Sequence, residues 1–569
     1  MKKLILTLAA AISLEVAAQD FTNPVLPYDY SDPDVCRVGN DYYLTASSFN
    51  CSPGLPLLHS TDLVNWTIVG YALEKVPNAD YVNGKVAHGN AVWAPSIRFH
   101  QGKYYIFWGD PDYGIYMVSA TDPRGEWSEP KMVKSGRGFI DPCPFWDKDG
   151  KGYLVHGVAA SRAKINSALF VQRLNAESDS VAGMPVLAYD GTYDVSNPAF
   201  TKNVNHTIEG PKMYARNGYY YILAPAGGVA TGWQLALRSK NVYGPYESKI
   251  VMMQGVSDIN GPHQGGWVDT PSGEDWFLHF QELQPFGRVV HLNPVRWVDD
   301  WPVMGEDKDG DGCGWPMRLC QKPNLPACQN AMQLSDDFNS VDLGLQWQWQ
   351  ANYEPWFGNT TNQGFIRIYS HIMEGNEQNM FHIPNMLLQK IPSSGCTVKA
   401  KVRVVAKDEL SRAGLIVMGL NYSALMLQVQ NGKFILFNTT CKNALNGQPE
   451  DTDILQSFAP DKEYNTGSTN STEISLYLQV RIDKEGKCRF GYSKDGKKYR
   501  ELNGTFQARE GRWIGAKMGL VAMTTSTKSR SWIDCDWFEV NTDNKAEVED
   551  DSYNFMKKKK KKNDNPTRQ

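Results

Sequence analysis

The chain has 569 residues, more than one ordinary domain holds, and its formal net charge is only −4. This balance excludes the basic surface expected of a nucleic-acid-binding protein. Aromatic residues make up 12% of the chain, which is typical of large β proteins and also of proteins that stack flat, neutral ligands.

Residues 1–18 are predicted to be a signal peptide. Lys2 and Lys3 precede a short apolar run over Leu4–Leu14, and small residues end at Ala18. The run is too short to cross a bilayer as a helix, so no membrane span is expected. We therefore expect a mature chain that begins near Gln19 and is secreted or periplasmic.

Residues 19–306 contain five copies of a turn followed by an aromatic strand. The spacing is very roughly 60 residues, in the range of propeller and solenoid repeats. Each copy is followed by further strands, which favours a five-bladed β-propeller, whereas a β-sandwich would not require five such hairpins in register. The five turn-strand segments are 40–44, 101–106, 150–154, 217–221 and 273–277.

Residues 307–333 are predicted to be a linker with two ambiguous features. Asp307–Gly312 resembles the start of an EF-hand calcium loop, but Arg318 stands where the bidentate acid belongs. Cys313, Cys320 and Cys328 are close enough in sequence for one disulfide bond. The ten cysteines of the chain are otherwise sparse, so we expect no disulfide framework.

Residues 334–545 are predicted to form a β-sandwich. Apolar and polar side chains alternate over 398–404, which indicates a strand with one buried face. Lys494-Asp495-Gly496 predicts a hairpin turn. Residues 546–569, with a lysine run at Lys557–Lys562, are expected to be a charged, disordered tail. The predicted fold class is therefore all-β, a propeller followed by a sandwich.

Five short segments, each about 10 to 13 residues before an aromatic strand, are candidates for a shared site. In a propeller the strand before the aromatic hairpin is the innermost strand, and its leading end points into the central channel. The residues that we expect to be equivalent, and to converge there, are Asp32, Trp93, Asp141, Glu209 and His263.

Three of these residues are acids, and acids that face one another raise each other's pKa. Glycoside hydrolysis needs such an asymmetry, with one protonated carboxylic acid and one ionised carboxylate. Asp before Pro is also a common turn starter, so Asp32 and Asp141 could each be structural. Their matching positions in the repeats favour the functional interpretation.

The propeller segment resembles glycoside hydrolase family 43, whose fold is a five-bladed β-propeller. The resemblance rests on Asn23-Pro24-Val25-Leu26, on Asp32 to Tyr43, and on the Trp93-Ala94-Pro95 and Glu209-Gly210-Pro211 motifs. It implies that Asp32 is the general base, Glu209 the general acid, and Asp141 the carboxylate that tunes and orients the acid. The family is inverting, which implies a base and acid roughly 6.5–9.5 Å apart.

The same resemblance implies further site residues. Phe49 matches an aromatic wall of the sugar pocket, Trp93 offers a second apolar wall, and Arg288 matches a substrate-binding arginine. His263 matches a histidine that helps to hold a cation, often calcium, in the propeller channel. No organic cofactor is expected.

The C-terminal segment resembles the concanavalin-like sandwich (jelly roll) that follows many exo-acting members, and the whole chain is most similar to subfamily 12. The resemblance implies an exo-α-L-arabinofuranosidase acting on arabinoxylan, xyloglucan or arabinan. A β-D-xylosidase is the alternative activity, because the two sugars present similar hydroxyl patterns. A non-catalytic carbohydrate-binding protein is the alternative from another class.

Overall fold

The structure is a computed structural model of the chain. It describes residues 20–192, 205–361, 364–373, 377–465, 470–527 and 531–542. The predicted signal peptide and the predicted charged tail lie outside the described residues.

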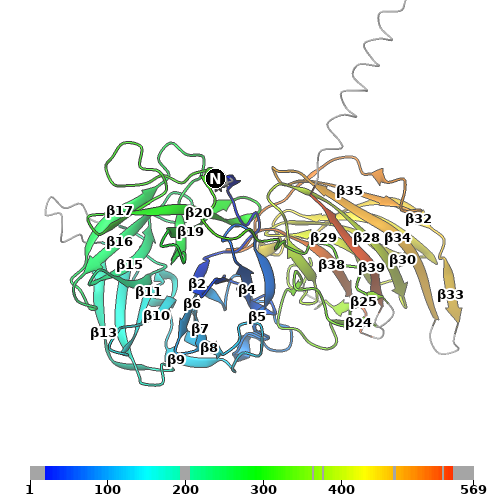
Figure 1. Cartoon of the computed structure of the whole chain (residues 1–569). Helices are drawn as coiled ribbons and strands as arrows, with labels where there is room; N and C mark the ends of the chain where they lie inside the picture. Colours follow the sequence, from blue (N-terminus) through cyan, green and yellow to red (C-terminus); the bar gives the residue numbers. More distant parts are fainter. Residues whose placement is uncertain are drawn as a thin grey trace, which may run out of the picture.

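The N-terminal half is a propeller of five four-stranded antiparallel sheets, each formed by consecutive strands (Figure 1). This arrangement confirms the predicted five-bladed fold. The blades are β2 (Asp34–Val38), β3 (Asp41–Thr45), β4 (Gly54–Ser60) and β5 (Thr67–Leu73); β6 (Trp93–His100), β7 (Lys103–Asp110), β8 (Gly114–Ala120) and β9 (Lys131–Ser135); β10 (Phe139–Trp146), β11 (Gly152–Val158), β12 (Ala168–Leu174) and β13 (Val181–Asp190); β14 (Lys212–Arg216), β15 (Tyr219–Ala226), β16 (Trp233–Ser239) and β17 (Glu247–Met253); and β18 (His263–Asp269), β19 (Asp275–Leu283), β20 (Gly287–Val298) and β21 (Trp301–Met304).

The first strand of each blade lies at the centre of the ring. Strand β18 contacts β2, β2 contacts β6, β6 contacts β10 and β10 contacts β14. The aromatic strands of the sequence pattern are the second strands, and their rings pack between neighbouring blades. The ring of Tyr43 in blade one, for example, meets that of Tyr104 in blade two edge-on, with centroids 5.3 Å apart. The repeat therefore places the five leading ends of the inner strands around one axis.

The segment before β2 is hydrogen-bonded to the last blade and to the segment that follows it. Asn23 donates from Nδ2 to the carbonyl oxygens of Leu292 and Met317, each at 2.8 Å, and accepts the Leu292 N–H at 2.8 Å. Strand β1 (Asp20–Thr22) pairs with β22 (Leu319–Gln321). The segment predicted to be a linker thus folds back along the propeller, while its cysteines, like all ten in the chain, are free thiols rather than a disulfide.

The C-terminal half is a sandwich of two sheets, antiparallel except where β26 pairs with β38, which confirms the second predicted fold (Figure 1). One sheet has the order β23-β27-β38-β29-β30-β31-β32 with β26 beside β38, and the other β24-β25-β39-β28-β34-β35-β36 with β33 and β37 at its edge. The bounds are β23 (Gln348–Trp349), β24 (Gly358–Thr361), β25 (Phe365–Tyr369), β26 (His371–Ile372), β27 (Leu387–Lys390), β28 (Cys396–Ala406), β29 (Ser411–Met418), β30 (Tyr422–Gln430), β31 (Lys433–Cys441), β32 (Asp451–Phe458), β33 (Lys462–Asn465), β34 (Asn470–Ile482), β35 (Lys487–Ser493), β36 (Arg500–Glu501), β37 (Phe506–Gln507), β38 (Lys517–Thr524) and β39 (Trp532–Asn541).

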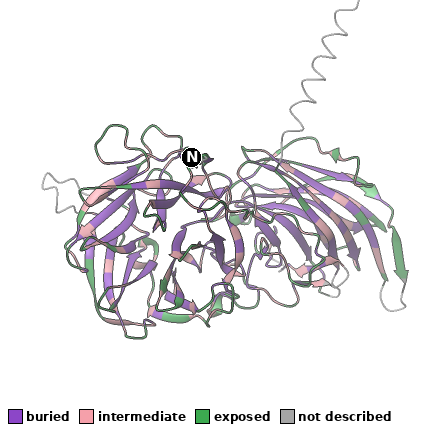
Figure 2. Cartoon of the chain, viewed as in Figure 1, coloured by how far each residue is buried: buried purple, intermediate pink, exposed green. Residues whose placement is uncertain are grey.

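The alternation predicted over 398–404 is real, because β28 alternates buried and half-buried residues along the sandwich core. Figure 2 shows buried residues along the central strands of both halves and exposed ones toward the outer strands. The only helices in the described ranges are η1 (Ala79–Tyr81), α1 (Ala160–Ala163) and η2 (Ala444–Asn446). None of them has the length and hydrophobicity needed to cross a bilayer.

The two halves share hydrogen bonds across a direct interface. Ser52 and Trp349 form a β-bridge, and the Asn352 side chain binds both the N–H and the carbonyl of Val76. Asp29 in the propeller accepts the backbone N–H of Arg288 at 2.9 Å and that of Gly515, in the sandwich, at 3.1 Å. The loop 509–515 of the sandwich is thereby fixed against the leading ends of the inner strands.

Candidate active site

A left-handed backbone conformation recurs at the leading end of every inner strand. Positive φ angles occur at equivalent positions of all five blades. This conformation is strained for every residue type except glycine. Three of them fall in bulges of β6, β10 and β18, where the register shifts. The five residues are Asp32 (φ 55°), Ala94 (φ 31°), Asp141 (φ 55°), Gly210 (φ 58°) and Gln264 (φ 26°).

The equivalence expected from the sequence therefore differs by one residue in three blades. Trp93, Glu209 and His263 each precede the strained position instead of occupying it. In blades two and five the strained residue lies in the bulge that shifts the register of the inner strand, whereas in blade four Glu209 and Gly210 lie in the segment just before β14. Only the backbone conformation distinguishes the strained residue from the residue before it, and sequence spacing does not encode that conformation.

Asp32 is buried and held at both carboxylate oxygens. Arg288 donates from Nη1 to Oδ1 at 2.8 Å, and the Ser47 hydroxyl donates to Oδ2 at 2.6 Å. Ser47 in turn accepts the backbone N–H of Ala94 at 2.7 Å, which fixes its hydroxyl as a donor toward Asp32. The two donors fix the orientation of the Asp32 carboxylate.

Asp141 lies beside the segment that carries Glu209. Its Oδ2 accepts the backbone N–H of Gly210 at 2.7 Å and the Gln264 side-chain amide at 3.3 Å. Glu209 makes no comparable hydrogen bond among the described residues, and its nearest charged-type contact is His263, with Nε2 to Oε1 at 3.5 Å. Its side chain is 24% exposed and faces the open cavity described below.

The two carboxyl groups differ in how well they tolerate a charge. Burial, together with the nearby Asp141 and Asp32, raises the pKa of Glu209 to about 8, which Arg288 only partly offsets. Burial and Asp32 also raise the pKa of Asp141. Because Asp141 accepts two N–H groups and Glu209 none, a proton shared between them belongs on Glu209.

These acids line one cavity of about 290 Å³ at the domain interface. Phe49 and Trp93 form walls, and Arg288 lies on the Asp32 side. Trp513, from the sandwich loop 509–515, completes the rim and meets Trp93 edge-on, with ring centroids 6.3 Å apart. The cavity is thus a pocket with one apolar wall supplied by each half of the chain.

His263 lies just behind this cavity and does not line it. Its ring is fully buried, and neither nitrogen makes a hydrogen bond within the described part of the chain. Burial and Arg288 lower the pKa of His263 to about 3, so the ring is neutral. A single neutral nitrogen suits a hydrated cation better than direct calcium ligation, which requires six to eight oxygens. Calcium in the channel stays a prediction.

Several residues that line or support the cavity were not predicted, and those with polar or aromatic side chains are Ser47, Thr207, Gln264 and Trp513. Ser47 and Gln264 are sequence neighbours of predicted residues, at Ser47-Ser48-Phe49 and His263-Gln264, so a search of neighbouring polar side chains would have found them. Trp513 is more than 200 residues away in the other domain. Its only signal is a large aromatic residue in a Gly- and Arg-rich loop.

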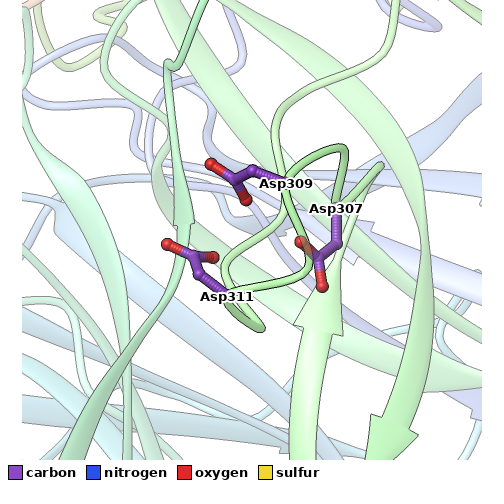
Figure 3. A group of neighbouring side chains, drawn as sticks. All are labelled: Asp307, Asp309 and Asp311. Carbon is purple, nitrogen blue, oxygen red and sulfur yellow. The ribbon is translucent and has the colours of Figure 1, made fainter.

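The loop that resembles an EF-hand brings three acids together. Ligand oxygens of Asp307, Asp309 and Asp311 lie within 4.8 Å of one another, and the three carboxylates face a common space (Figure 3). Asp307 also accepts the N–H groups of Gly310 and Gly312, which is ordinary turn chemistry. Within the described ranges this is the only such group of three or more His, Cys, Asp or Glu side chains, and His263 is not part of one.

Comparison with known families identifies both halves of the chain. Residues 21–302 match the model of glycosyl hydrolases family 43. Residues 335–541 match the beta xylosidase C-terminal concanavalin A-like domain. These two segments correspond to the propeller and the sandwich.

Relatives match over nearly the whole length. A protein of Xylanibacter ruminicola named "Putative beta-xylosidase" is 34% identical over 88% of this chain and 86% of its own. The "Non-reducing end alpha-L-arabinofuranosidase BoGH43B" of Bacteroides ovatus is 27% identical over 93% of this chain and 96% of its own. The crystal structure of a mutant of the GH43 protein BlXynB from Bacillus licheniformis aligns with a TM-score of 0.76 at 25% identity, covering 92% of this chain and all of that one.

Proposed function

Because the chain belongs to glycoside hydrolase family 43, we propose that it is an inverting exo-glycosidase that removes a terminal pentose from a plant hemicellulose. The observation that carries the proposal is the 290 Å³ cavity in which Asp32, Asp141 and Glu209 meet. A non-catalytic sugar-binding protein would have no use for a carboxylic acid kept protonated near neutral pH.

The contacts of each acid support a separate role. Glu209, with its raised pKa, donates a proton to the leaving glycosidic oxygen. Asp32, held in place by hydrogen bonds from Arg288 and Ser47, accepts a proton from the attacking water on the opposite face of the sugar. Asp141 touches neither reacting bond; its charge keeps the proton on Glu209.

The small size of the pocket supports exo action. Phe49, Trp93 and Trp513 supply apolar faces for one sugar ring, and Arg288 supplies a charged donor at its edge. A long polymer cannot pass through such a pocket, so a chain end or a side-chain tip must enter. This geometry suits β-D-xylosides and α-L-arabinofuranosides alike.

We place β-D-xylosidase activity first, because the relative at 34% identity carries that name. The α-L-arabinofuranosidase activity favoured by sequence resemblance is the second candidate, supported by the Bacteroides ovatus relative. Turnover of aryl β-D-xyloside is expected to exceed that of aryl α-L-arabinofuranoside. The opposite ranking would reverse the assignment, and NMR of the first-formed anomer would expose a retaining mechanism.

Trp513→Ala is expected to lower kcat/KM for an aryl β-D-xyloside by about tenfold, because one ring face and the rim of the pocket are lost. Most of the effect should fall on KM. Steady-state kinetics measure it, with Trp301→Ala on the propeller surface as the control. An unaltered KM would show that the sandwich does not contact the substrate.

The pH profile of kcat/KM should fall on its alkaline side with an apparent pKa near 8, since the acid must be protonated and burial raises the pKa of Glu209 to about 8. Activity is present below this pKa and is lost as the pH rises through it. A profile measured from pH 4 to pH 10 tests this. An alkaline limb near pH 5 would remove Glu209 from the role of acid.

We also propose that the protein is exported and cleaved before Gln19, as the sequence over residues 1–18 indicates. Amino-terminal sequencing of protein expressed with its leader tests this, and recovery of uncleaved Met1 in every fraction would contradict it.

A further inference from the structure

A second cavity, of about 680 Å³, lies at the opposite end of the propeller channel, and we call it the distal cavity. All five inner strands contribute to it through their trailing ends, whereas the catalytic acids lie at or before their leading ends. A strand rises about 3.3 Å per residue, so the five steps from Asp32 to Arg37, and likewise from Asp141 to Trp146, place the catalytic acids roughly 16 Å from the trailing ends of their strands. Each inner strand lines the cavity with a residue near its trailing end: Arg37, His100, Trp146, Arg216 and Asp269.

The channel between the two cavities is closed by buried polar side chains. Arg98 donates from Nη1 to Asp34 Oδ2 at 2.5 Å and from Nη2 to the Cys143 thiol at 3.2 Å. Lys212 fills the same inner layer and is fully buried. A glycan bound at the catalytic acids therefore cannot pass through to the distal cavity, which makes this a separate site.

The distal cavity is lined by aromatic rings held in fixed orientations. Trp146 stacks on His100 with an interplanar angle of 4° and centroids 4.5 Å apart. The Nε1 of Trp146 donates to Ser178 Oγ at 2.9 Å, and that of Trp267 donates to Asp275 Oδ1 at 2.8 Å. Phe99 leaves 40% of its surface exposed. Rings of this kind are ready-made platforms for the apolar faces of sugars.

Each charged group that lines the distal cavity has a partner, although the partner is not always an opposite charge at the cavity: Arg216 pairs with Asp300 at 3.8 Å, and Asp275 accepts the indole N–H groups of Trp267 and Trp297. Arg37 forms a bidentate pair with Asp269, with contacts of 2.9 and 2.7 Å, and Asp269 remains half exposed. Arg216 lies over the ring of Trp297, 4.2 Å from its centroid. Paired charges attract no strongly charged ligand, while planar carboxylate and guanidinium groups can bind adjacent hydroxyls.

We propose that the distal cavity binds a neutral oligosaccharide, a few units of the same polymer that presents the substrate. This choice of ligand rests on the proposed function. The volume lies within the roughly 300–1,000 Å³ typical of ligand sites. A polymer held here would raise the local concentration of chain ends near the catalytic cavity without entering it.

Affinity electrophoresis through gels containing soluble arabinoxylan tests the proposal, using the full chain with Glu209→Gln to prevent hydrolysis. Trp146→Ala and Trp267→Ala are each expected to weaken retardation by about 3- to 10-fold in apparent affinity. Trp127→Ala is the matched control, since this half-buried indole of blade two lies outside both cavities and binds only the Pro123 carbonyl. It should migrate like the parent.

Kinetics separate binding from structural damage. With Glu209 intact, Trp146→Ala should leave aryl β-D-xyloside turnover unchanged and reduce turnover of arabinoxylan. The proposal is overturned if the parent is not retarded, if both tryptophan variants migrate like the parent, or if they lose aryl xyloside turnover to the same extent as binding. Failure of the proposed function is distinguishable from failure of this proposal. In that case Glu209→Gln would keep the glycosidase turnover of the parent, whatever the electrophoresis shows.

Discussion

Glu209→Gln is expected to lower kcat on natural glycosides by about 10²- to 10⁴-fold, the usual contribution of a general acid. The amide keeps the size of the side chain but cannot release a proton to the leaving oxygen. Substrates with a good leaving group, such as dinitrophenyl xyloside, should lose much less. Initial rates on both substrate types measure the difference, and equal losses on the two would contradict the role.

The same variant should be more stable than the parent at alkaline pH. A carboxyl whose folded pKa is raised destabilises the native state increasingly as the pH climbs from its unfolded value toward about 8, and this cost is absent in acid. A Gln side chain carries no charge at any pH, so this destabilisation is absent from the variant. Thermal melts at pH 5 and pH 8 check the sign, with Glu247→Gln, at a half-exposed carboxylate of the same blade, as the control.

Asp32→Asn is expected to lower kcat by a similar factor of about 10²–10⁴, with no rescue by a better leaving group, because the attacking water loses its base. The contrast with Glu209→Gln on dinitrophenyl xyloside separates base from acid. If the activated substrate were turned over by Asp32→Asn at the parental rate, Asp32 would not be the base.

Asp32→Asn is expected to lower the stability of the protein, in contrast to Glu209→Gln. Arg288 is buried, and Asp32 is its ion-pair partner at 2.8 Å. Replacing the carboxylate with an amide leaves that guanidinium without its counter-charge, which costs on the order of 1–3 kcal/mol. Urea denaturation measures the change. Asp269→Asn, which loosens the more exposed Arg37 pair, is the matched control and should cost less.

The sequence predicts the fold well because the repeat is carried by the most buried part of each blade. Tyr43 and Tyr104 pack between blades, so their spacing had to recur for the ring to close. The sandwich was equally readable from the alternation in β28, where burial follows the pleat from Cys396 to Val404. Neither inference required knowledge of long-range contacts.

The candidate site was predictable only as far as the repeat reaches. Asp32 and Asp141 occupy equivalent strained positions, whereas Glu209 reaches the pocket from one residue earlier, beside Gly210. Trp513 has no repeat to mark it, since its place depends on how two domains dock. A contact between residues so far apart in the chain leaves no periodic trace in the sequence.

The propeller and the sandwich both line the pocket, so its sandwich side can be engineered separately from its catalytic side. Asp29 binds backbone groups of both Arg288 and Gly515, which fixes the end of the loop 509–515 by main-chain contacts, and Gly515 itself has to stay glycine because a Cβ there would lie 2.2 Å from the Phe286 carbonyl oxygen. Loops of equal length from other family members could be transplanted onto this frame. Substrate preference would then be retuned from the sandwich while the acids of the propeller stay untouched.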